Sequence, residues 1–361
     1  ARDRRAGQAV RRAAIERPER LFRHAFGSGV RRAVHIAVRR PGNHGRNDEG
    51  DADDAAGNAG GTRTQSYILD STALAPIVNL QSDTGLSGSD KITNAGTVNV
   101  TGLETGASWQ YSTNGGTSWS SGLGSNFTIS GDGVKTVLVR QTDVAGNTSV
   151  SQSFTFTLDT TVPSAPGVTL TSDTGLSSTD TKTNVGTLSL SGVETGAKVE
   201  YSVDGGETWS TSFSAVEGSN TVLVRQTDVA GNTSAASTYS FTLDTTAASP
   251  TVSLSSDSGT DGSDKVTNVG TVSVDGIESG ASWEYSTNAG STWTTGTGST
   301  FSVSGDGSKT VLVRQTDVAG NQSGATEFSF TLDTKLPSAP GVDLVSDTGL
   351  SGTDGKTNTG A

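Results

Sequence analysis

The sequence predicts an all-β chain built from tandem copies of one seven-strand β-sandwich. First, the octapeptide RQTDVAGN occurs three times without change, about 85 to 90 residues apart, beginning at Arg140, Arg225 and Arg314. Second, the motifs LDT and SDTG (once SDSG) recur in the same register. Third, apolar and polar residues alternate between turns rich in Gly, Asn and Asp, which is typical of short strands in a sandwich.

Each repeat contains the same series of predicted strands. A short apolar strand opens the repeat, the SDTG turn follows, and later segments alternate apolar residues with Ser or Thr. The aromatic and valine side chains at alternate positions are interpreted as core residues. In the first repeat the apolar segments are 76–80, 97–100, 109–111, 127–129, 137–139 and 154–158.

Length differences between repeats concentrate in one connection. The conserved spacing from the SDTG aspartate to a later Trp is 36 residues in every repeat. From that Trp, at position 119, 209 or 293, to the Arg of the octapeptide the count is 21, 16 and 21 residues. We therefore expect a surface loop in this connection that is shorter in the second repeat.

Charge divides the chain at residue 63. Residues 1–63 contain 14 Arg, no Lys and 8 acidic residues, a balance of +6, whereas residues 64–361 have a balance of −18. The basic segment lacks strand or helix periodicity, and we interpret it as a disordered or non-native N-terminal segment rather than a nucleic-acid-binding arm. The predicted domains are 1–63 atypical basic, 64–70 end of a preceding repeat, 71–159 repeat 1, 160–244 repeat 2, 245–333 repeat 3 and 334–361 partial repeat 4.

Composition argues against an enzyme. The chain has no Cys, and its three His all precede residue 63, so the repeats contain no set of residues for nucleophilic catalysis. No apolar run is long enough to insert in a membrane. The segment Ser202–Trp209 fits an Asp-box, S-x-D-x-G-x-T-W, which we interpret as a β-hairpin turn because each repeat has a single Arg.

Two other functions stay open at this stage. Exposed Trp119, Trp209 and Trp293 would form a platform for a carbohydrate- or protein-binding module. A secreted hydrolase with accessory domains would require a catalytic domain outside this chain. Solvent exposure of the three Trp side chains distinguishes the first alternative from a structural role.

Acidic residues are predicted to converge at the junctions between repeats. In a seven-strand sandwich, alternate loops share one pole, so the SDTG loop lies near the following linker and the DVAGN loop near the preceding one. A hard cation with oxygen ligands, Ca²⁺, would relieve the repulsion. The alternative is that these residues only cap turns. The predicted ligands are Asp83, Asp90, Asp132, Asp159, Asp228 and Asn232 at the first junction, and Asp173, Asp180, Glu217, Asp244, Asp317 and Asn321 at the second.

The order of these motifs resembles the bacterial immunoglobulin-like repeats of giant RTX-type and biofilm-associated adhesins. The resemblance runs from LDTTxPxAP through SDTGxSxxD, E-x-G-A and G-G-x-T-W to V-R-Q-T-D-x-A-G-N, and it covers residues from about 67 to 361. It implies a linear array of immunoglobulin-like seven-strand sandwiches, secreted by a type I system and retained at the bacterial cell surface. No GGxGxD nonapeptide is present, so the export signal is expected elsewhere.

The resemblance also implies a function. The array would be a monomeric extender in which linker Ca²⁺ stiffens neighbouring repeats, while domains outside this chain bind a host or abiotic surface. The implied ligands are Asp159 and Asp244 of the linkers with Asp228 and Asp317; Asp70 and Asp143 match too, but we expect no preceding domain to complete that site. The linker Ala247–Pro250 lacks the PSAPG sequence of Pro163–Gly167 and is expected to be less rigid.

Overall fold

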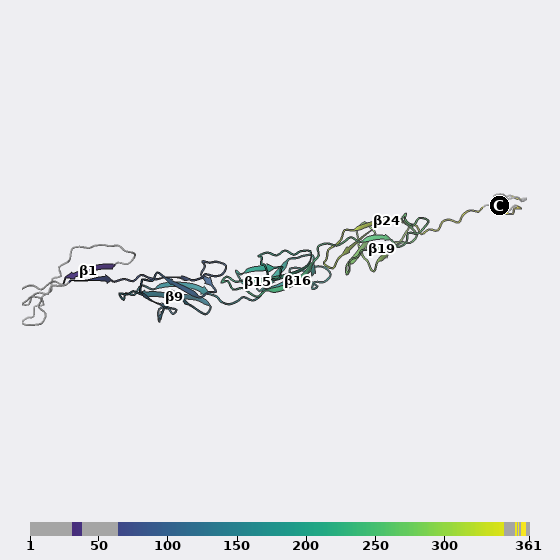
Figure 1. Cartoon of the computed structure of the whole chain (residues 1–361). Coiled ribbons are helices and arrows are strands. Elements are labelled where there is room, and N and C mark those ends of the chain that lie inside the picture. The colour runs from purple at the N-terminus through teal and green to yellow at the C-terminus, as the bar shows by residue number, and fades with distance from the viewer. Residues whose placement is uncertain (1–30, 38–63, 343–350, 352, 354, 359–361) are drawn as a thin grey trace, which may run out of the picture. The chain divides into compact units, whose positions relative to one another are not determined.

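The computed structural model describes residues 31–37, 64–342, 351, 353 and 355–358 (Figure 1). All regular secondary structure in this part of the chain is β-strand. The residues form two compact units, one of residues 1–163 with 227–233 and the other of residues 164–226 with 234–361. Among the described residues, no helix is long and apolar enough to cross a membrane.

Repeat 1 is a two-layer β-sandwich in the first unit. A three-stranded sheet has the order β3-β5-β8, and a five-stranded sheet has the order β4-β10-β9-β6-β7. Leu158 of one sheet and Val98 of the other belong to the same buried core, together with Trp109 at 4% exposure. The strands are β3 Ile77–Leu80, β4 Ile92–Thr93, β5 Thr97–Thr101, β6 Ser108–Ser112, β7 Ser120–Ser121, β8 Asn126–Thr128, β9 Gly133–Thr142 and β10 Gln152–Leu158.

Repeat 3, in the second unit, has the same architecture. Its sheets are β17-β19-β22 and β18-β24-β23-β20-β21, and Trp283 takes the place of Trp109 in the core. The short strand β18 pairs parallel to β24, as β4 does to β10. The strands are β17 Thr251–Leu254, β18 Val266–Thr267, β19 Thr271–Asp275, β20 Ser282–Ser286, β21 Thr294–Thr295, β22 Thr300–Ser302, β23 Gly307–Thr316 and β24 Thr326–Leu332.

Repeat 2 is a reduced version of the same sandwich. Its sheets are β11-β13 and β12-β16-β15-β14. It has no strand that corresponds to β8, and only an isolated bridge between Tyr201 and Ser210 corresponds to β7. The loss falls in the connection that the sequence predicts to be short, where too few residues remain to form the extra strand. The strands are β11 Gly167–Leu170, β12 Lys182–Thr183, β13 Leu188–Ser191, β14 Lys198–Ser202, β15 Gly218–Thr227 and β16 Ser237–Leu243.

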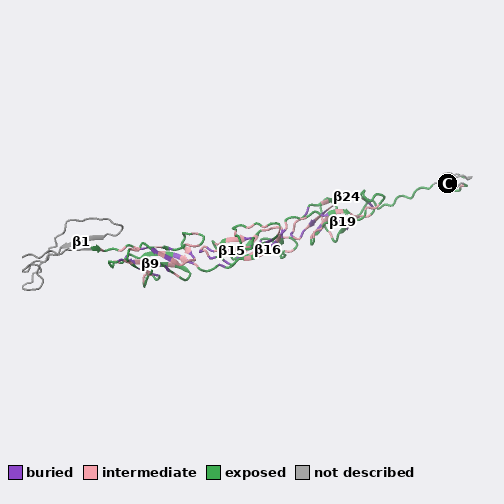
Figure 2. Cartoon of the chain, in the orientation of Figure 1, coloured by how far each residue is buried: buried purple, intermediate pink, exposed green. Residues whose placement is uncertain are grey.

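The prediction of tandem all-β sandwiches is confirmed, although the strand number varies. Repeats 1 and 3 have eight strands and repeat 2 has six, against the predicted seven. The additional strands, such as β4 and β7, have only two residues each. A strand of two residues is too short to show an alternating apolar pattern in the sequence. The buried residues lie within the three sandwiches, mainly on their strands (Figure 2).

One segment departs from the prediction of disorder. Arg31–Ala37 forms strand β1, which pairs antiparallel with β2, Thr64–Asp70, in the register Arg31↔Asp70 to Ala37↔Thr64. The segment RRAVHIA contains enough small and β-branched residues to extend beside a strand that would otherwise lack a partner. The rest of residues 1–63, and residues 343–350 of the partial fourth repeat, lie outside the described residues.

The longest strand of each repeat brings polar residues to inward positions. In β9, Val137 and Val139 are buried in the core, and the same alternation then buries Gln141 at 0% exposure. Asp143, directly after the strand, is also buried. Because the strand continues its inward alternation beyond the apolar core, it places a polar amide and a carboxylate at the end of the sandwich, beside the linker.

A candidate metal centre in the linkers

Three carboxylates meet where the linker enters repeat 3. Asp244 follows β16, Glu278 follows β19 and Asp317 follows β23, and one oxygen from each lies within 4.8 Å of the others. Asp317 is 1% exposed, while Asp244 and Glu278 are partly buried. Three hard oxygen donors at this spacing can share one cation, because Ca²⁺ binds oxygen at about 2.3–2.6 Å.

Asn321 joins Asp317 to the linker. Its side-chain amide donates to Oδ2 of Asp317 at 2.7 Å and to the backbone carbonyl of Asp244 at 2.7 Å, and its backbone amide donates to Oδ1 of Asp317 at 2.8 Å. The tight DVAGN turn makes these bonds possible, because Gly320 adopts a φ of +94° that favours glycine. The predicted residues Asp244, Asp317 and Asn321 therefore lie together.

A buried glutamine positions the third carboxylate. Gln315, 0% exposed, accepts from the backbone amide of Glu278 at 2.8 Å and donates to the backbone carbonyl of Ala248 at 2.6 Å. Oε1 of Glu278 accepts from the amide of Ala248 at 2.7 Å. Glu278 and Gln315 thus attach the linker to the sandwich and hold the glutamate beside Asp244.

The cluster is electrostatically strained. Burial raises the pKa of the Asp244 carboxyl, and repulsion from Asp317, Glu217 and Glu278 raises it further, against a hydrogen bond from the Thr246 amide. A cation bound at this position would remove that repulsion without displacing a buried salt bridge.

The linker before repeat 1 has the same arrangement. Asp70, Glu104 and Asp143 also have carboxylate oxygens within 4.8 Å of one another. The Asn147 side chain donates to Asp143 Oδ2 at 2.8 Å and to the Asp70 carbonyl at 3.0 Å, and it lowers the pKa of Asp143. Its third carboxylate, Glu104, comes from repeat 1, as Glu278 comes from repeat 3 in the other cluster.

The residues of the second repeat share part of this pattern. Asn232 donates to the Asp159 carbonyl at 2.8 Å and to Oδ2 of Asp228 at 2.8 Å, so these three predicted residues also lie together. Asp159, Glu194 and Asp228 hold the sequence positions that correspond to Asp244, Glu278 and Asp317.

Four of the predicted ligands make turn contacts within their own loops. Oδ2 of Asp83 accepts from the Lys91 amide at 2.9 Å, and Oδ1 of Asp90 accepts from the Ile92 amide at 2.9 Å. In repeat 2, Asp173 and Asp180 accept in the same way from the amides of Thr181 and Lys182, each at 3.0 Å. These bonds hold each carboxylate in its own SDTG loop, as expected of turn-capping residues.

One oxygen of the first aspartate in each SDTG or SDSG loop has no bond. Oδ1 of Asp83, Asp173 and Asp257 is buried and lacks a hydrogen-bond partner at the same place in each described repeat. A buried carboxylate oxygen without a donor is costly, so a water molecule or cation at this position would stabilise the loop.

The remaining two predicted ligands reach the linkers as hydrogen-bond acceptors. Asp132 accepts from the amide and hydroxyl of Thr160 and from the hydroxyl of Thr161, and these bonds lower its pKa, that from the Thr161 hydroxyl most. Glu217 accepts from the amide and hydroxyl of Thr245 at 3.1 and 2.9 Å. Both positions tie the end of a sandwich to the chain that leaves it.

Sequence reasoning missed the glutamates and glutamines of the clusters. Glu104 and Glu278 stand in the E-x-G-A motif, which recurs in each repeat but contains no predicted ligand. Gln141, Gln226 and Gln315 are all 0% exposed. The sequence did contain a signal for the glutamines. In each octapeptide the Gln stands two residues after the second of two alternating inward valines, so it is also expected to point inward. A buried side-chain amide needs hydrogen-bond partners.

The Trp side chains do not form an open platform. The guanidinium carbon of Arg140 lies 3.9 Å from the ring centroid of Trp119, and Arg225 covers Trp209 at 3.8 Å. Arg314 covers Trp293 at 3.9 Å, and all three Trp are only partly exposed. A cation over one face of each ring stabilises it in place and disfavours the carbohydrate-platform alternative.

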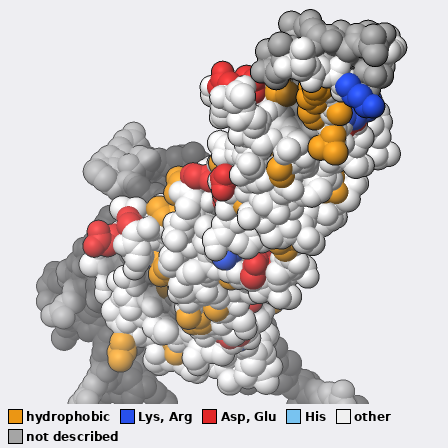
Figure 3. Space-filling model, turned by 90° about the vertical axis from the view of Figure 1, so that its right-hand side faces the viewer, with side chains coloured by type: hydrophobic (Ala, Val, Ile, Leu, Met, Phe, Trp, Pro, Cys, Tyr) orange, Lys and Arg blue, Asp and Glu red, His pale blue; other side chains and the backbone are white. Residues whose placement is uncertain are grey.

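The Asp-box acts as a turn, as expected. Oδ1 of Asp204 accepts from the Ser202 hydroxyl at 2.6 Å and from the Thr208 amide at 2.9 Å, and these bonds, that from Ser202 most, lower the pKa of Asp204. On the face drawn in Figure 3, most of the described surface is uncharged polar side chain or backbone, and the acidic groups form separate small patches.

Fold and linker geometry together define a class of protein, an array of immunoglobulin-like β-sandwich domains in tandem. Within the array, residues 70–160 and 161–245 each match the family model of the bacterial Ig-like domain. These two matches cover repeats 1 and 2. A search of curated proteins found no match.

Two solved structures show what the chain is similar to. Fibronectin(III)-like modules of CbhA from Clostridium thermocellum align at 16% identity and a TM-score of 0.30, over 46% of this chain and 94% of the other. A tetra-tandem repeat in the extending region of a large adhesion protein aligns at 18% identity and a TM-score of 0.25, over 84% and 82%.

Proposed function

We propose that this chain is a non-enzymatic extender segment of a secreted bacterial surface adhesin, with Ca²⁺ bound at the carboxylate clusters of its linkers. The tandem bacterial Ig-like domains support the structural part of the proposal. The observation that carries the metal part is the convergence of Asp244, Glu278 and Asp317. One of these ligands belongs to the linker and two belong to the sandwich that follows.

The donor set fits calcium. All three groups are carboxylates, which are hard oxygen ligands, and Ca²⁺ tolerates irregular geometry with six to eight oxygens. A bound ion would fix the linker residue Asp244 relative to Glu278 and Asp317, in addition to the contacts through Asn321 and Gln315. Fewer conformations of the linker mean a stiffer connection between sandwiches. Asp83 and Asp173, with their unpartnered oxygens, are proposed as further ligands.

Direct protein contacts would add to the stiffness. The SDTG loop of repeat 2 contacts the DVAGN loop of repeat 3, where the Leu176 amide donates to the Val318 carbonyl at 3.3 Å. Gly175 is so close to this loop that a Cβ would lie 2.0 Å from the Val318 carbonyl oxygen. Such contacts are possible without metal, so the ion is proposed to reinforce a junction that already has a defined geometry.

Isothermal titration of the chain with CaCl₂ after chelator treatment tests the metal proposal. We expect saturable binding to wild type, and a lower number of bound ions for Glu278→Gln because that variant removes one charge from a cluster. Glu327→Gln, which alters an exposed carboxylate on β24, is the matched control and should bind as wild type does. Absence of binding heat, together with an unchanged melting curve in EDTA, would refute the calcium sites.

The extender role has its own test. Small-angle scattering of the chain in Ca²⁺ and in EDTA should show a narrower distribution of inter-repeat distances with the ion. Identical scattering in both conditions would contradict stiffening even if calorimetry detected binding.

A further inference from the structure

Repeat 2 has an open sheet edge where repeats 1 and 3 have a third strand. In repeat 1, β5 pairs with β3 on one side and with β8 on the other, and in repeat 3 β19 pairs with β17 and β22 in the same way. In repeat 2, β13 pairs with β11 alone. Residues 211–216 take the place of the missing strand in the sequence. They approach the edge at one end, where a Cβ on Gly186 would lie 2.6 Å from the β-carbon of Ala215, but they form no ladder with β13 among the described pairings.

The core beside this edge is incompletely covered. Val98 and Val100 of β5 are 0% and 1% exposed. Leu188 and Leu190 hold the same positions in β13, and both are only partly buried. Larger apolar side chains are therefore more exposed in repeat 2 than their smaller counterparts in repeat 1.

The sequence encodes the opening through two linked changes. In repeat 1, the Trp109 ring packs against Gly122, and its indole nitrogen donates to the Gly124 carbonyl at 3.0 Å. Repeat 2 lacks the residues that correspond to this loop, and Val199 stands at the position of Trp109. Loss of both the loop and the side chain that supports it removes the anchor of the third strand.

Backbone groups of β13 face the gap. In repeat 1, the Val100 amide donates to the Ser125 carbonyl at 2.8 Å, and the Gly96 carbonyl accepts from the Ile129 amide at 2.8 Å. The corresponding groups in repeat 2 are the amide of Leu190 in β13 and the carbonyl of Gly186, two residues before β13. Neither group makes the equivalent bond to residues 211–216. An edge with unpaired groups and no charge, proline or bulge is a template for another strand.

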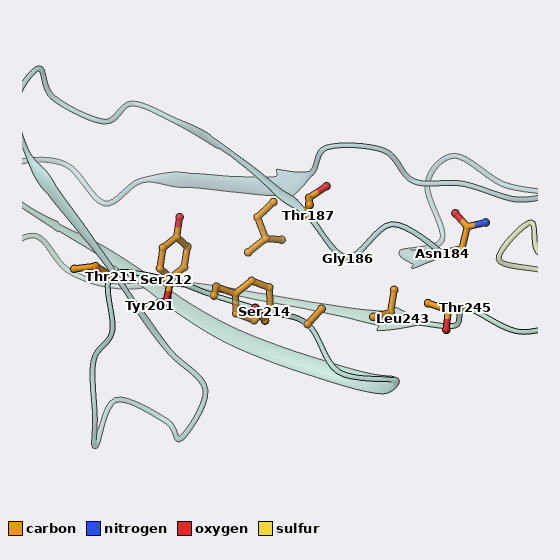
Figure 4. Close-up of a pocket in the computed structure, with 12 residues that line it drawn as sticks. Asn184, Gly186, Thr187, Tyr201, Thr211, Ser212, Ser214, Leu243 and Thr245 are labelled. Carbon is orange, nitrogen blue, oxygen red and sulfur yellow. The ribbon is translucent and has the colours of Figure 1, made fainter.

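A groove of about 590 Å³ lies along this edge (Figure 4). Leu188, Phe213, Ala215 and Leu243 supply apolar surface, and Tyr201 lines it near one end. In the view of Figure 4, Gly186 and Thr187 lie on the opposite side of the groove from Ser212 and Ser214. Phe213 is 6.0 Å from Tyr201 between ring centroids, whereas Phe127 stacks on Tyr111 at 4.1 Å, so the phenyl ring only partly replaces its counterpart.

We propose that repeat 2 accepts an extended peptide of a partner protein as an additional strand antiparallel to β13. The strand that fills this place in repeat 1, Asn126–Thr128 followed by Ile129, indicates the pattern: an aromatic residue and a β-branched residue separated by one hydroxyl residue. Main-chain hydrogen bonds to β13, with the Leu190 amide as a donor, would supply affinity, and the apolar groove would select the side chains.

Charge selects the chemistry of the peptide further. β8 runs antiparallel to β5, with Thr128 opposite Thr97 and Asn126 opposite Asn99, so the carboxyl end of a bound peptide would lie near Gly186. Thr245 lines that end of the groove. The carboxylate of Glu217 accepts hydrogen bonds from the amide and the hydroxyl of Thr245, so a negative charge lies beside this end. A Lys or Arg that follows the aromatic–hydroxyl–aliphatic pattern within one or two residues would therefore lie near the carboxylate of Glu217.

The same charge argument disfavours a second copy of this chain as the occupant. Residues 64–361 have a net charge of −18, so edge-to-edge pairing of two copies brings like charges together. Self-association through β13 can be distinguished by experiment, because dimer formation would depend on protein concentration and would require no peptide.

Binding of a synthetic peptide to the full chain tests the proposal. The probe is SNFTISKK, which copies Ser125–Ser130 and adds two lysines; the matched controls replace Phe by Ser, or the lysines by glutamates. Titration calorimetry should give saturable binding for the probe, weakened at least about tenfold by loss of the phenyl group. Hydrogen exchange of the Leu190 amide should slow by at least about tenfold at saturation.

A restored variant provides the decisive control. Replacing residues 210–217 by residues 120–132 of repeat 1, together with Val199→Trp, should rebuild the third strand and abolish binding. Unchanged binding to this variant, binding indifferent to the phenyl group, or no saturation up to millimolar peptide would each overturn the proposal. Concentration-dependent dimerisation without peptide binding would overturn it in favour of self-association. Running the titrations with Ca²⁺ and with EDTA separates this result from the metal sites.

Discussion

The hydroxyl of Thr174, in the second repeat, donates a 2.6 Å hydrogen bond to the backbone carbonyl of Ala319, in the third. The same hydroxyl accepts from the backbone amide of Asn184 at 2.8 Å. The Thr174 side chain therefore joins its own SDTG loop to the segment after β12 and to the DVAGN turn of repeat 3. Thr84 makes the equivalent 2.8 Å bond to Ala230 in the first unit. The SDTG loop is therefore a docking element for the DVAGN turn of the following repeat.

Thr174→Val should weaken this docking without disturbing the core of repeat 2. We expect a loss of about 1–3 kcal/mol in the coupling between repeats 2 and 3, because the Ala319 carbonyl and the Asn184 amide lose a partner. Differential scanning calorimetry would show the two unfolding transitions separating. Thr174→Ser keeps the hydroxyl, as Ser258 does in repeat 3, and should behave as wild type; equal effects of both substitutions would contradict a role for the bond.

Asp244→Asn should stabilise the metal-free protein at neutral pH. Burial and neighbouring carboxylates raise the pKa of Asp244, so its charged form disfavours folding above that pKa. As pH falls through the raised pKa, the wild-type carboxyl binds a proton and the advantage of Asn disappears. Melting curves in EDTA across acidic and neutral pH measure this. With saturating Ca²⁺ the order should reverse, and a variant equally stabilised in both conditions would argue against Asp244 as a ligand.

Gln315→Leu should destabilise repeat 3 by at least about 2 kcal/mol. The substitution leaves the Glu278 amide and the Ala248 carbonyl without their buried partner, and each unsatisfied group costs about 1–3 kcal/mol. Urea denaturation monitored by Trp fluorescence gives the free energy of unfolding. Gln322→Leu, at an exposed position six residues before Phe328, is the control and should change it little.

Gly122→Ala should destabilise repeat 1 by about 1–3 kcal/mol through overpacking. A Cβ at this position would lie 2.1 Å from Cε2 of the Trp109 ring, which is itself buried in the core. Gly88→Ala is the matched control, because its Cβ would meet only the Asp83 carbonyl oxygen at 3.9 Å. A similar melting temperature for both variants would show that the Trp109 contact is not rigid.

Asp306→Asn should weaken repeat 3 at neutral pH and have no effect in strong acid. Hydrogen bonds from the side chain and amide of Thr334 lower the pKa of Asp306 below its ordinary value of 3.8. A lowered pKa stabilises the fold above the ordinary value, and the contribution is lost as pH falls through the lowered one. Melting temperatures of wild type and variant should therefore converge on acidification; a difference that persists in acid would point to a packing effect.

Part of the candidate site could be predicted from sequence. Asp244 and Asp317 stand in repeated motifs, and alternation of loops between two poles placed them near one linker. Glu278 was missed because its contact with Ala248 depends on how the linker folds back along the sandwich, which motif order does not show. Asp83 and Asp90 stand in the loop that contacts the DVAGN turn, but motif order does not show that backbone amides of the same loop, those of Lys91 and Ile92, bind one oxygen of each carboxylate.

The repeat period and the two-residue alternation of apolar side chains determined the tandem β-sandwich, because burying one face of each strand leaves few other solutions. The sequence also showed that the second repeat has a shorter connection and Val199 at the position of Trp109. Only the tertiary structure decided that this difference removes a whole strand and opens the edge of β13. Strand pairing depends on contacts between residues that are distant in sequence. The local pattern of residues 188–191 therefore does not show that β13 lacks a partner strand on one side.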